Sequence, residues 1–310
     1  MANIPNGTLY SAEQSLQTPE IRSPEPYHQK GPPEEDDIDT KIADPGTDQP
    51  APAVSVIIPF HDAGATLERA LDSLAAQSFT DWEAVLVNDA SHDDGAALAA
   101  ARSEADPRIR LLHLADNLGV AKARNHGIRA ARGRWIGFLD ADDCWHPDKL
   151  ARQVPVLQAG APIVFSAYER VTTAGDSLGI VPARARVSYH DALSGNPIGC
   201  LTAVWDSARF GKAELPILPM HEDYAFWLSL LRQGAEAHGL PEVLAFYQVS
   251  PTSLSGRKLR AARAVWSILR AEPDMTLPRL LTGFAGYIAE ALWRRRPSTQ
   301  RMPKPGPARR

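Results

Sequence analysis

Four short apolar runs alternate with three helix-like segments between residues 54 and 139. The runs are rich in β-branched and aromatic residues and have the length of strands; they lie at 54–59, 82–87, 109–114 and 135–139. The helix-like segments lie at 67–77, 95–105 and 119–132. A β-α-β-α-β-α-β order predicts a mostly parallel sheet, because parallel strands are joined by crossovers that are usually helices. We therefore predict an α/β fold with helices flanking the sheet.

Composition divides the 310 residues into a central domain and two unlike ends. Residues 1–53 hold ten acidic residues, three basic residues and nine of the 26 prolines, a composition that cannot bury a core. From residue 294 onward the chain has seven basic residues and no acidic one. We expect a disordered tail at 1–52, an α/β domain at 53–256, C-terminal helices at 257–296 and a basic tail at 297–310.

The overall composition argues against several classes of protein. A net charge of −4 gives no indication of a nucleic-acid partner. Two cysteines, Cys144 and Cys200, form no disulfide framework and indicate a reducing compartment. The N-terminus lacks the basic and apolar regions of a signal peptide, and no run reaches the roughly 18–20 apolar residues of a membrane span. We therefore expect a cytoplasmic protein.

Three carboxylates, those of Asp140, Asp142 and Asp143, directly follow the apolar run at 135–139. Mg²⁺ and Mn²⁺ take oxygen ligands, and Mg²⁺ is commonly shared between protein carboxylates and substrate phosphates. The carboxyl ends of strands in an open α/β sheet are also where ligands bind. The alternative is a plain turn, because aspartate is common in turns and at helix starts.

Two further strand ends carry polar or special residues, at 59–62 and 88–91. Because the carboxyl ends of parallel strands meet at one edge, we expect the first two strands to end in a slot for a nucleoside. An ionised Asp89 could accept the imide N–H of a uracil, since a carboxylate is only an acceptor. No Gly-x-Gly-x-x-Gly or Gly-x-x-x-x-Gly-Lys follows the first strand, so neither a dinucleotide fold nor a P-loop is indicated.

Several short motifs follow one another in a fixed order along the chain. They are 54–59, 74–83, 87–91, 117–119, 123–128, 138–143, 221–224, 227–228 with Leu231, 244–247 and 253–255. In this order the chain resembles the family 2 glycosyltransferases of the GT-A type, which have a Rossmann-like sheet. The resemblance covers roughly residues 53–270 and is closest to the branch that makes bacterial envelope polysaccharides and exopolysaccharides. Each motif alone is weak, but the ordered combination is specific.

The resemblance implies a nucleotide-sugar site at the carboxyl ends of the strands. It places Pro59, Phe60 and Asp89 around the nucleotide, with Asp89 on the uracil. Arg124 would lie near the donor, and Asp140 would contact the ribose or the sugar. The donor class that it implies is a UDP-sugar.

The same resemblance implies a metal ligand and a base on the acceptor side. Asp142 would ligate the divalent cation, Mn²⁺ or Mg²⁺, that bridges the donor diphosphate. Asp223 would deprotonate the acceptor hydroxyl, with Glu222 beside it as the other candidate. Two positions depart from the family pattern: Asn88 stands where a second acid is usual, and His221 stands where many relatives have arginine.

These roles predict an inverting transferase that moves a hexose or N-acetylhexosamine to a saccharide acceptor. One base on the face opposite the leaving group suffices for a single displacement with inversion. We expect the acceptor to be lipid-linked, as in envelope polysaccharide synthesis. One alternative is a nucleotidyltransferase acting on sugar phosphates, but the basic Gly-rich loop that it needs after the first strand is missing. The other is a non-catalytic GT-A sugar-binding module, which loss of Asp142 or Asp223 would suggest; both are present.

The C-terminal segment leaves two interpretations open. Apolar residues at helical spacing between 280 and 293 precede the basic run 294–296. Such a basic amphipathic end can lie on an anionic membrane, here the cytoplasmic face of the inner membrane. It can equally pack on the catalytic domain, with the arginines as a solvated charge run.

The aromatic and imidazole side chains are open to plainer interpretations as well. Trp205 and Trp227 either stack on an acceptor sugar or pack in the core, and the segment 195–199 is either a simple turn or part of the acceptor side. The histidines show no ligand spacing such as His-x-x-x-His, so we expect surface or core histidines. This expectation applies to six of the nine histidines, namely His61, His92, His113, His126, His190 and His221. Of these, we tie only His221 to the site.

Overall fold

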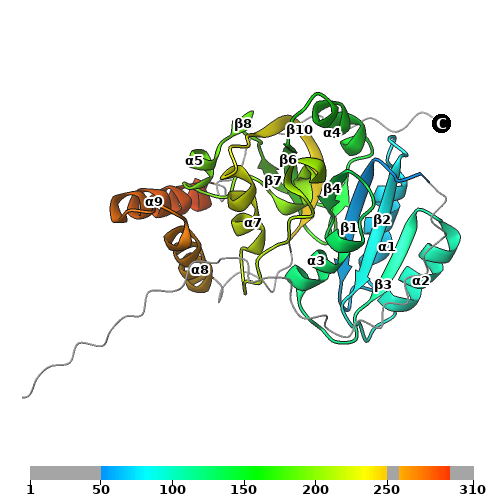
Figure 1. Ribbon diagram of the computed structural model, residues 1–310. Coiled ribbons are helices and arrows are strands. Elements are labelled where there is room, and N and C mark those ends of the chain that lie inside the picture. Colours follow the sequence, from blue (N-terminus) through cyan, green and yellow to red (C-terminus); the bar gives the residue numbers. More distant parts are fainter. Residues whose placement is uncertain (1–49, 250–257, 294–310) are drawn as a thin grey trace, which may run out of the picture.

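One sheet of ten strands runs through the part of the chain that the computed structural model describes, residues 50–249 and 258–293 (Figure 1). The strands are β1 (Val54–Phe60), β2 (Trp82–Asn88), β3 (Ile109–His113), β4 (Trp135–Phe138), β5 (Cys144–Trp145), β6 (Ile163–Val171), β7 (Ser177–Val181), β8 (Arg186–Val187), β9 (Val204–Asp206) and β10 (Ala237–Gln248). Their order in the sheet is β3-β2-β1-β4-β9-β6-β10-β5. β7 pairs with β6 beside this path, and β8 pairs with β10.

The first four strands form the predicted parallel half of the sheet. β1 pairs in parallel with β2 and β4, and β2 pairs in parallel with β3. Every residue of β1, β2 and β4 is buried, as expected for strands covered by helices on both faces. The ends of these strands lie within one residue of the sequence-based prediction.

The second half of the sheet is mixed, which the sequence did not predict. β9 is antiparallel to both of its neighbours, β4 and β6, whereas β10 runs parallel to β6. β9 has three residues and β5 has two, so neither is long enough to show a periodic pattern. "Mostly parallel" therefore describes β1–β4, and the full sheet of the described residues is mixed.

The helices divide the core into two layers, one on each face of the sheet. They are α1 (Leu67–Ala75), α2 (Gly95–Ala105), α3 (Val120–Ala130), α4 (Lys149–Gln158), α5 (Tyr189–Ala192), α6 (Ser207–Phe210), α7 (Glu222–Leu231), α8 (Lys258–Ala271) and α9 (Leu277–Trp293), with a 3₁₀ turn at Cys200–Thr202. Side chains of α1, α2 and α4 share one layer with Val56 and Ile58 of β1. Side chains of α3, α7 and α8 share the other layer with Ile57, because successive strand residues point to opposite faces.

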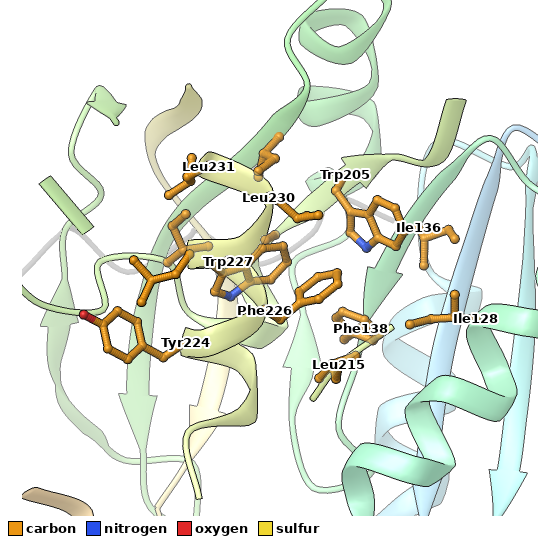
Figure 2. Packing of buried hydrophobic residues seen from close by; sticks show 14 of the residues in the cluster. Ile128, Ile136, Phe138, Trp205, Leu215, Tyr224, Phe226, Trp227, Leu230 and Leu231 are labelled. Atoms are coloured by element: carbon orange, nitrogen blue, oxygen red, sulfur yellow. The ribbon is translucent and has the colours of Figure 1, made fainter. Parts of the chain in front are cut away.

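An aromatic cluster packs α7 against the sheet in the second layer (Figure 2). The ring centroid of Phe226 lies 5.6 Å from that of Trp205 and 6.2 Å from that of Phe138. Trp205 and Trp227 are 0% and 1% exposed. Both tryptophans are core residues, so the interpretation that they stack on an acceptor sugar is wrong for the structure as it stands.

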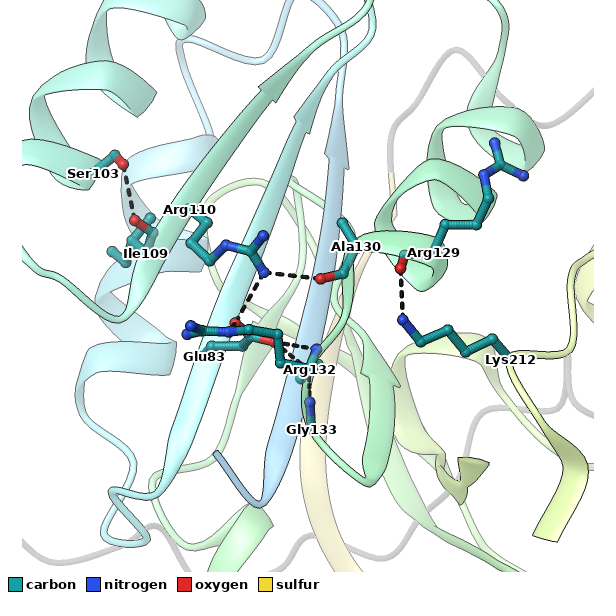
Figure 3. Close-up of polar contacts among 10 residues, drawn as sticks. Glu83, Ser103, Ile109, Arg110, Arg129, Ala130, Arg132, Gly133 and Lys212 are labelled. Carbon is teal, nitrogen blue, oxygen red and sulfur yellow. Dashed lines mark hydrogen bonds and ion pairs between the residues drawn. The ribbon is translucent and has the colours of Figure 1, made fainter. Parts of the chain in front are cut away.

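A buried carboxylate ties the amino ends of the parallel strands together (Figure 3). Glu83 of β2 is 1% exposed and accepts hydrogen bonds from Ser55 Oγ at 2.6 Å and from Arg110 Nη1 at 3.2 Å. The backbone N–H and the Nε of Arg132, just after α3, donate to it at 2.7 and 2.9 Å. Burial alone would raise the pKa of Glu83, but these hydrogen bonds and the Arg110 charge outweigh it and lower the pKa.

The C-terminal helices are partly packed and partly open. Val265, Ile268 and Leu269 of α8 and Leu280 of α9 belong to the core layer of α7. α9 also exposes four large apolar side chains, those of Leu277, Leu281, Ile288 and Leu292. Among the residues described, none of the helices combines the length and apolar character that crossing a bilayer requires. Residues 1–49, the motif at 253–255 and the basic segments at 294–296 and 297–310 lie outside the described residues.

Candidate active site

The loops after β1 and β2 meet at the carboxyl edge of the sheet, as predicted. The backbone N–H of Asp89 donates to the carbonyl of Phe60 at 2.9 Å, and the N–H of Asp62 donates to Ser91 Oγ at 3.2 Å. The side chains of Pro59 and Phe60 are buried, and Phe60 packs in the core layer of α1. The contact of these two residues with a nucleotide stays a prediction.

Asp89 holds the loop that leads into α3. Its Oδ1 accepts the N–H of Leu118 at 2.7 Å, and its Oδ2 accepts the N–H of Gly119 at 2.9 Å. Gly119 has a φ of 86°, a left-handed conformation that favours glycine. Sequence reasoning missed this anchoring role. A carboxylate has about four lone-pair sites, so the predicted contact with uracil stays compatible with both bonds.

Arg124 of α3 connects the two carboxylate motifs. Its side chain is 5% exposed, and its guanidinium donates to Asp140 Oδ1 at 2.6 Å and to Glu222 Oε1 at 2.9 Å. Asp140 follows β4 and Glu222 opens α7, so one side chain joins three separate elements. Burial raises the pKa of Glu222, and the Asp223 charge adds to this while Arg124 opposes it.

The Asp140–Asp143 cluster contains a buried carboxylate with an oxygen unpaired among the described residues. Asp143 is 1% exposed; its Oδ1 accepts the N–H of Gln248 at 2.8 Å, while its Oδ2 is buried and has no partner in the described chain. Burial, followed by the Asp140 and Asp142 charges, raises the pKa of Asp143 well above its usual range. Asp142 opens toward solvent, yet surrounding protein atoms and the Asp140 charge raise its pKa too. An unpaired buried carboxylate oxygen beside two further carboxylates fits a hard divalent cation.

Asp142 also borders a small pocket. The pocket has a volume of about 190 Å³ and is lined by Arg69, Asp142, Cys144, Val171, Gly175, Phe246 and Gln248. Arg69 donates to the backbone carbonyl of Asp142 at 2.9 Å and to the side-chain oxygen of Gln248. The pairing of β10 with β6 and β5 brings Gln248 to the cluster, a long-range effect with no local sequence signal.

Glu222 and Asp223 are adjacent but face different partners. Glu222 is bound to Arg124, whereas Asp223 Oδ2 accepts a hydrogen bond from Asn196 Nδ2 at 3.2 Å. His221, just before α7, has a φ of 60° and lies near the ring of Tyr287 in α9. The structure therefore brings the segment 195–199 to the acceptor-side motif, the outcome that the sequence had left open.

A second hollow of about 520 Å³ lies next to Asn196. Its lining residues are Val181, Pro182, Ala183, Arg184, Ser194, Pro197, Gly286, Ala289 and Glu290. Ser194 and Pro197 flank the Asn196 that holds Asp223, and Gly286 and Ala289 belong to α9. The hollow thus lies between the segment 194–197 and the C-terminal helix α9.

Comparison with known proteins agrees with this geometry. A family model described as glycosyl transferase family 2 matches residues 55–186, from β1 to the start of β8. TuaG of Bacillus subtilis, named as a teichuronic acid biosynthesis glycosyltransferase, is 33% identical over 246 residues, which cover 79% of this chain and 98% of TuaG. WfgD of Escherichia coli, a UDP-Glc:α-D-GlcNAc-diphosphoundecaprenol β-1,3-glucosyltransferase by name, is 31% identical over 229 residues, 73% of this chain and 89% of WfgD.

A solved structure shows the same fold. The mannosyltransferase PcManGT of Pyrobaculum calidifontis, in complex with GDP-Man and Mn²⁺, superposes with a TM-score of 0.56 at 22% identity, over 79% of this chain and 76% of that one. At that level of identity the likeness establishes the GT-A fold and not the substrate. The sequence matches cover nearly all of TuaG and most of WfgD, so the chain belongs to glycosyl transferase family 2.

Proposed function

We propose that this glycosyltransferase moves a hexose or N-acetylhexosamine from a UDP-sugar to a lipid-linked saccharide, with inversion, in bacterial polysaccharide synthesis. The observation that carries the proposal is Arg124, which bonds both to Asp140 of the carboxylate cluster and to Glu222 of the acceptor-side motif. Donor and acceptor machinery therefore meet at one buried side chain. The names of TuaG and WfgD support the polysaccharide context and the lipid-linked acceptor.

The donor side is proposed to rest on the carboxyl edge of β1, β2 and β4. Asp89 orders the loop before α3 and offers its remaining lone pairs to the base. Asp142 and Asp143 would hold a divalent cation, Mn²⁺ or Mg²⁺, with Asp140 kept in place by Arg124. Such a cation supplies Lewis-acid neutralisation of the diphosphate leaving group.

Asp223 is the proposed general base. Asn196 donates to its Oδ2, which orients the carboxylate and leaves Oδ1 free to take the proton of the acceptor hydroxyl. Glu222 Oε1 is instead ion-paired with Arg124, so we assign Glu222 to holding Arg124 and Asp223 to the proton transfer. One oriented base supports a single displacement, and hence inversion.

The acceptor is proposed to enter along the hollow beside Asn196, which α9 borders. The exposed apolar side chains of α9 would rest on the cytoplasmic face of the inner membrane, where a lipid-linked saccharide resides. The arginines at 294–296 follow α9 directly in sequence and suit an anionic surface.

A thermal-shift screen of nucleotide-sugars with Mn²⁺ and with EDTA tests the donor assignment. A ligand that binds only the folded protein stabilises it by about 2.7 kcal/mol at a hundredfold excess over its dissociation constant. We expect a UDP-sugar to stabilise the protein only with the cation, and to be transferred to a polyprenyl-diphosphate sugar. Release of pyrophosphate from UTP and a sugar phosphate would instead identify a nucleotidyltransferase, and binding without turnover a non-catalytic module.

Vesicle sedimentation tests the membrane assignment. Leu281→Ser combined with Leu292→Ser should reduce binding to anionic vesicles, because it removes two side chains that are 52% and 61% exposed. Ile217→Ser is the matched control, since Ile217 is 57% exposed and lies away from α9 in the sequence. Equal loss of binding in both variants would refute a specific role for α9.

A further inference from the structure

A second group of metal-ligating side chains lies at the carboxyl ends of β1 and β2, apart from the carboxylate cluster. His61 and Asp62 follow β1, and His92 follows β2. One potential ligand atom from each of the three lies within 4.8 Å of the other two, and all three residues are exposed. The imidazole rings of His61 and His92 meet edge to face with centroids 6.0 Å apart.

The contacts of His61 define which ring nitrogen is available. Its Nδ1 lies 2.8 Å from the backbone carbonyl oxygen of Asp89, and only a protonated Nδ1 can donate to a carbonyl. The neutral ring then carries its lone pair on Nε2, which lies 3.5 Å from Asp62 Oδ2. A hydrogen bond from the other ring nitrogen to a carbonyl is the arrangement that orients metal-bound histidines.

The spacing of the ligand atoms suits a small ion. Zinc binds histidine nitrogen and carboxylate oxygen at about 2.0–2.2 Å in a tetrahedral site, which separates neighbouring ligand atoms by roughly 3.3 Å. The 3.5 Å between His61 Nε2 and Asp62 Oδ2 is already close to this separation. Rotation of the His92 ring is the adjustment that brings in the third ligand.

The two loops that carry these residues are fixed relative to each other. Asp62 Oδ1 accepts the backbone N–H of His92 at 2.7 Å, and Asp93 Oδ2 accepts that of Gly64 at 2.6 Å. Asp62 and Ala90 have φ values of 48° and 55°, left-handed conformations that are uncommon outside glycine. Backbone strain of this kind persists where the surroundings over-determine the conformation, and it clusters at functional sites.

We propose that His61, Asp62 and His92 bind one first-row transition ion, with Zn²⁺ as the preferred occupant. Two imidazoles and one carboxylate select such an ion over Mg²⁺, which prefers a shell of oxygen ligands. Three protein ligands leave one coordination position open to solvent, at the rim of the predicted nucleotide slot. The site is chemically distinct from the all-oxygen cluster at Asp140–Asp143 and does not depend on the proposed transfer reaction.

Co²⁺ titration of the full chain tests the proposal, because Co²⁺ reports nitrogen ligation and coordination number through its visible absorption. We expect both the wild-type chain and Asp142→Ala to bind one equivalent of Co²⁺ with the intense spectrum of a tetrahedral or five-coordinate site; Co²⁺ in the all-oxygen cluster of the wild type would be six-coordinate and absorb only weakly. Zn²⁺ should displace it, and Mg²⁺ in large excess should not.

Substitutions then locate the site. His92→Ala should weaken Co²⁺ and Zn²⁺ binding by at least about tenfold. Even the loss of a residue that hydrogen-bonds to a metal ligand lowers metal affinity by roughly 10–100-fold. His190→Ala is the matched control, because His190 is an exposed histidine outside the cluster. Asp62→Asn is a second variant that keeps an oxygen to accept the N–H of His92, and it should also bind more weakly. Circular dichroism and the melting temperature verify folding of each variant.

Three results would overturn the proposal. The first is Co²⁺ binding by His92→Ala and Asp62→Asn with wild-type affinity. The second is loss of the absorption in Asp142→Ala, which would assign the ion to the carboxylate cluster. The third is an equal effect of His190→Ala, which would indicate non-specific binding to surface histidines.

Discussion

The two ends of the parallel strands β1–β4 hold buried carboxylates in opposite electrostatic states. At the amino end, Glu83 receives hydrogen bonds from Ser55, Arg110 and Arg132, and its pKa is lowered. At the carboxyl end, Asp143 is equally buried, has one oxygen without a partner in the described residues, and has a raised pKa.

The difference separates a carboxylate that stabilises the fold from carboxylates arranged for a ligand. A buried charge stabilises a fold only when its partners replace the lost water, which Glu83 achieves with two arginines and a hydroxyl. The three aspartates at the other end repel one another, and only Asp140 is paired with a buried cation, Arg124. Clustered, unsatisfied charge of this kind points to a binding site.

Asp142→Ala should have the largest effect, and it should abolish the proposed cation binding at the carboxyl end while leaving the Glu83 network at the amino end unchanged. The variant removes a proposed cation ligand, so we expect sugar transfer to fall by about 10³-fold or more, in keeping with several kcal/mol of transition-state stabilisation from a metal. Mn²⁺-dependent donor binding, measured by calorimetry, should be lost. The melting temperature without metal should not fall, since one of three repelling charges is gone. Transfer at near wild-type rate with unchanged Mn²⁺ dependence would show that the metal assignment is wrong.

Asp223→Asn should lower turnover by something on the order of 10²–10⁴, the usual contribution of a general base. The amide keeps the size of the side chain and its bond with Asn196 but cannot take a proton. Donor affinity should stay nearly unchanged, because the proposed base faces the acceptor. Single-turnover transfer and donor calorimetry measure the two quantities separately.

Glu222→Gln is the control for the base assignment. Its ion pair with Arg124 predicts a smaller loss of turnover, arising from a displaced Arg124. If Glu222→Gln is inactive while Asp223→Asn is active, the two roles must be exchanged. If both variants are active, the acceptor-side motif has been misinterpreted.

Glu83→Gln should destabilise the fold at the amino ends of the parallel strands and leave the rate of sugar transfer unchanged. Removing one partner of a buried ion pair costs about 3–5 kcal/mol, because Arg110 and Arg132 lose their counter-charge. At roughly 2–4 °C per kcal/mol for a domain of this size, we expect the melting temperature to fall by at least 6 °C. Transfer per folded molecule should be unchanged below the transition. A large loss of activity without loss of stability would contradict the separation of the two ends.

Local patterns in the sequence were sufficient for the parallel half of the fold. The runs that became β1 to β4 are long, β-branched and bounded by turn residues, and the helix predicted at 95–105 is observed as Gly95–Ala105. The mixed half depends on β5, β8 and β9, strands of two or three residues that exist only because neighbouring strands pair with them. Tertiary pairing decides such elements, and no local pattern reports it.

The sequence identified residues of the candidate site where they stand in ordered motifs and not where distant segments meet. Asp142 and Asp223 stand in ordered motifs, and their proposed roles were read from those motifs. The bond of Asn196 to Asp223 and that of Gln248 to Asp143 join residues far apart in the chain. The pairing of His61 with His92 depends on the parallel register of β1 and β2, so spacing along the sequence could not reveal it.

The two ends should also titrate in opposite directions. Ionised Glu83 stabilises the folded protein at pH values above its unfolded pKa. This stabilisation is lost as the pH falls through its lowered folded pKa. Asp143 has a raised folded pKa. Its contribution to the stability of the folded protein is therefore present below the unfolded pKa and is lost as the pH rises through the folded pKa. Asp143→Asn mimics the protonated acid and should therefore stabilise the metal-free protein most at neutral pH and progressively less in acid.

Urea unfolding in EDTA at a series of pH values measures this dependence. Glu83→Gln should show the opposite sign: a deficit that is largest at neutral pH and disappears only when the wild-type Glu83 itself is protonated. Parallel curves for Asp143→Asn and wild type at all pH values would mean that Asp143 is not a source of electrostatic strain.

Deletion of residues 1–49 should have the smallest effect. It should leave unchanged both the Glu83 network at the amino ends of the parallel strands and the carboxylate cluster at their carboxyl ends. The core layers begin with Ala53 and Val54, and Ala53 accepts the N–H of Trp135 through its carbonyl at 3.0 Å. The deleted segment has an acidic, proline-rich composition that cannot bury a core, so we expect the free energy of unfolding to change by no more than about 0.5 kcal/mol. Transfer to a soluble acceptor should be unchanged.

Deletion of residues 1–56 is the matched control. It removes Val54 and Val56, both 0% exposed, and the Ser55 hydroxyl that donates to Glu83, and it should prevent stable folding. A drop of several degrees in the melting temperature of the shorter deletion would show that the tail contributes to the fold, and a loss of transfer alone would show that it contributes to the carboxyl-end site.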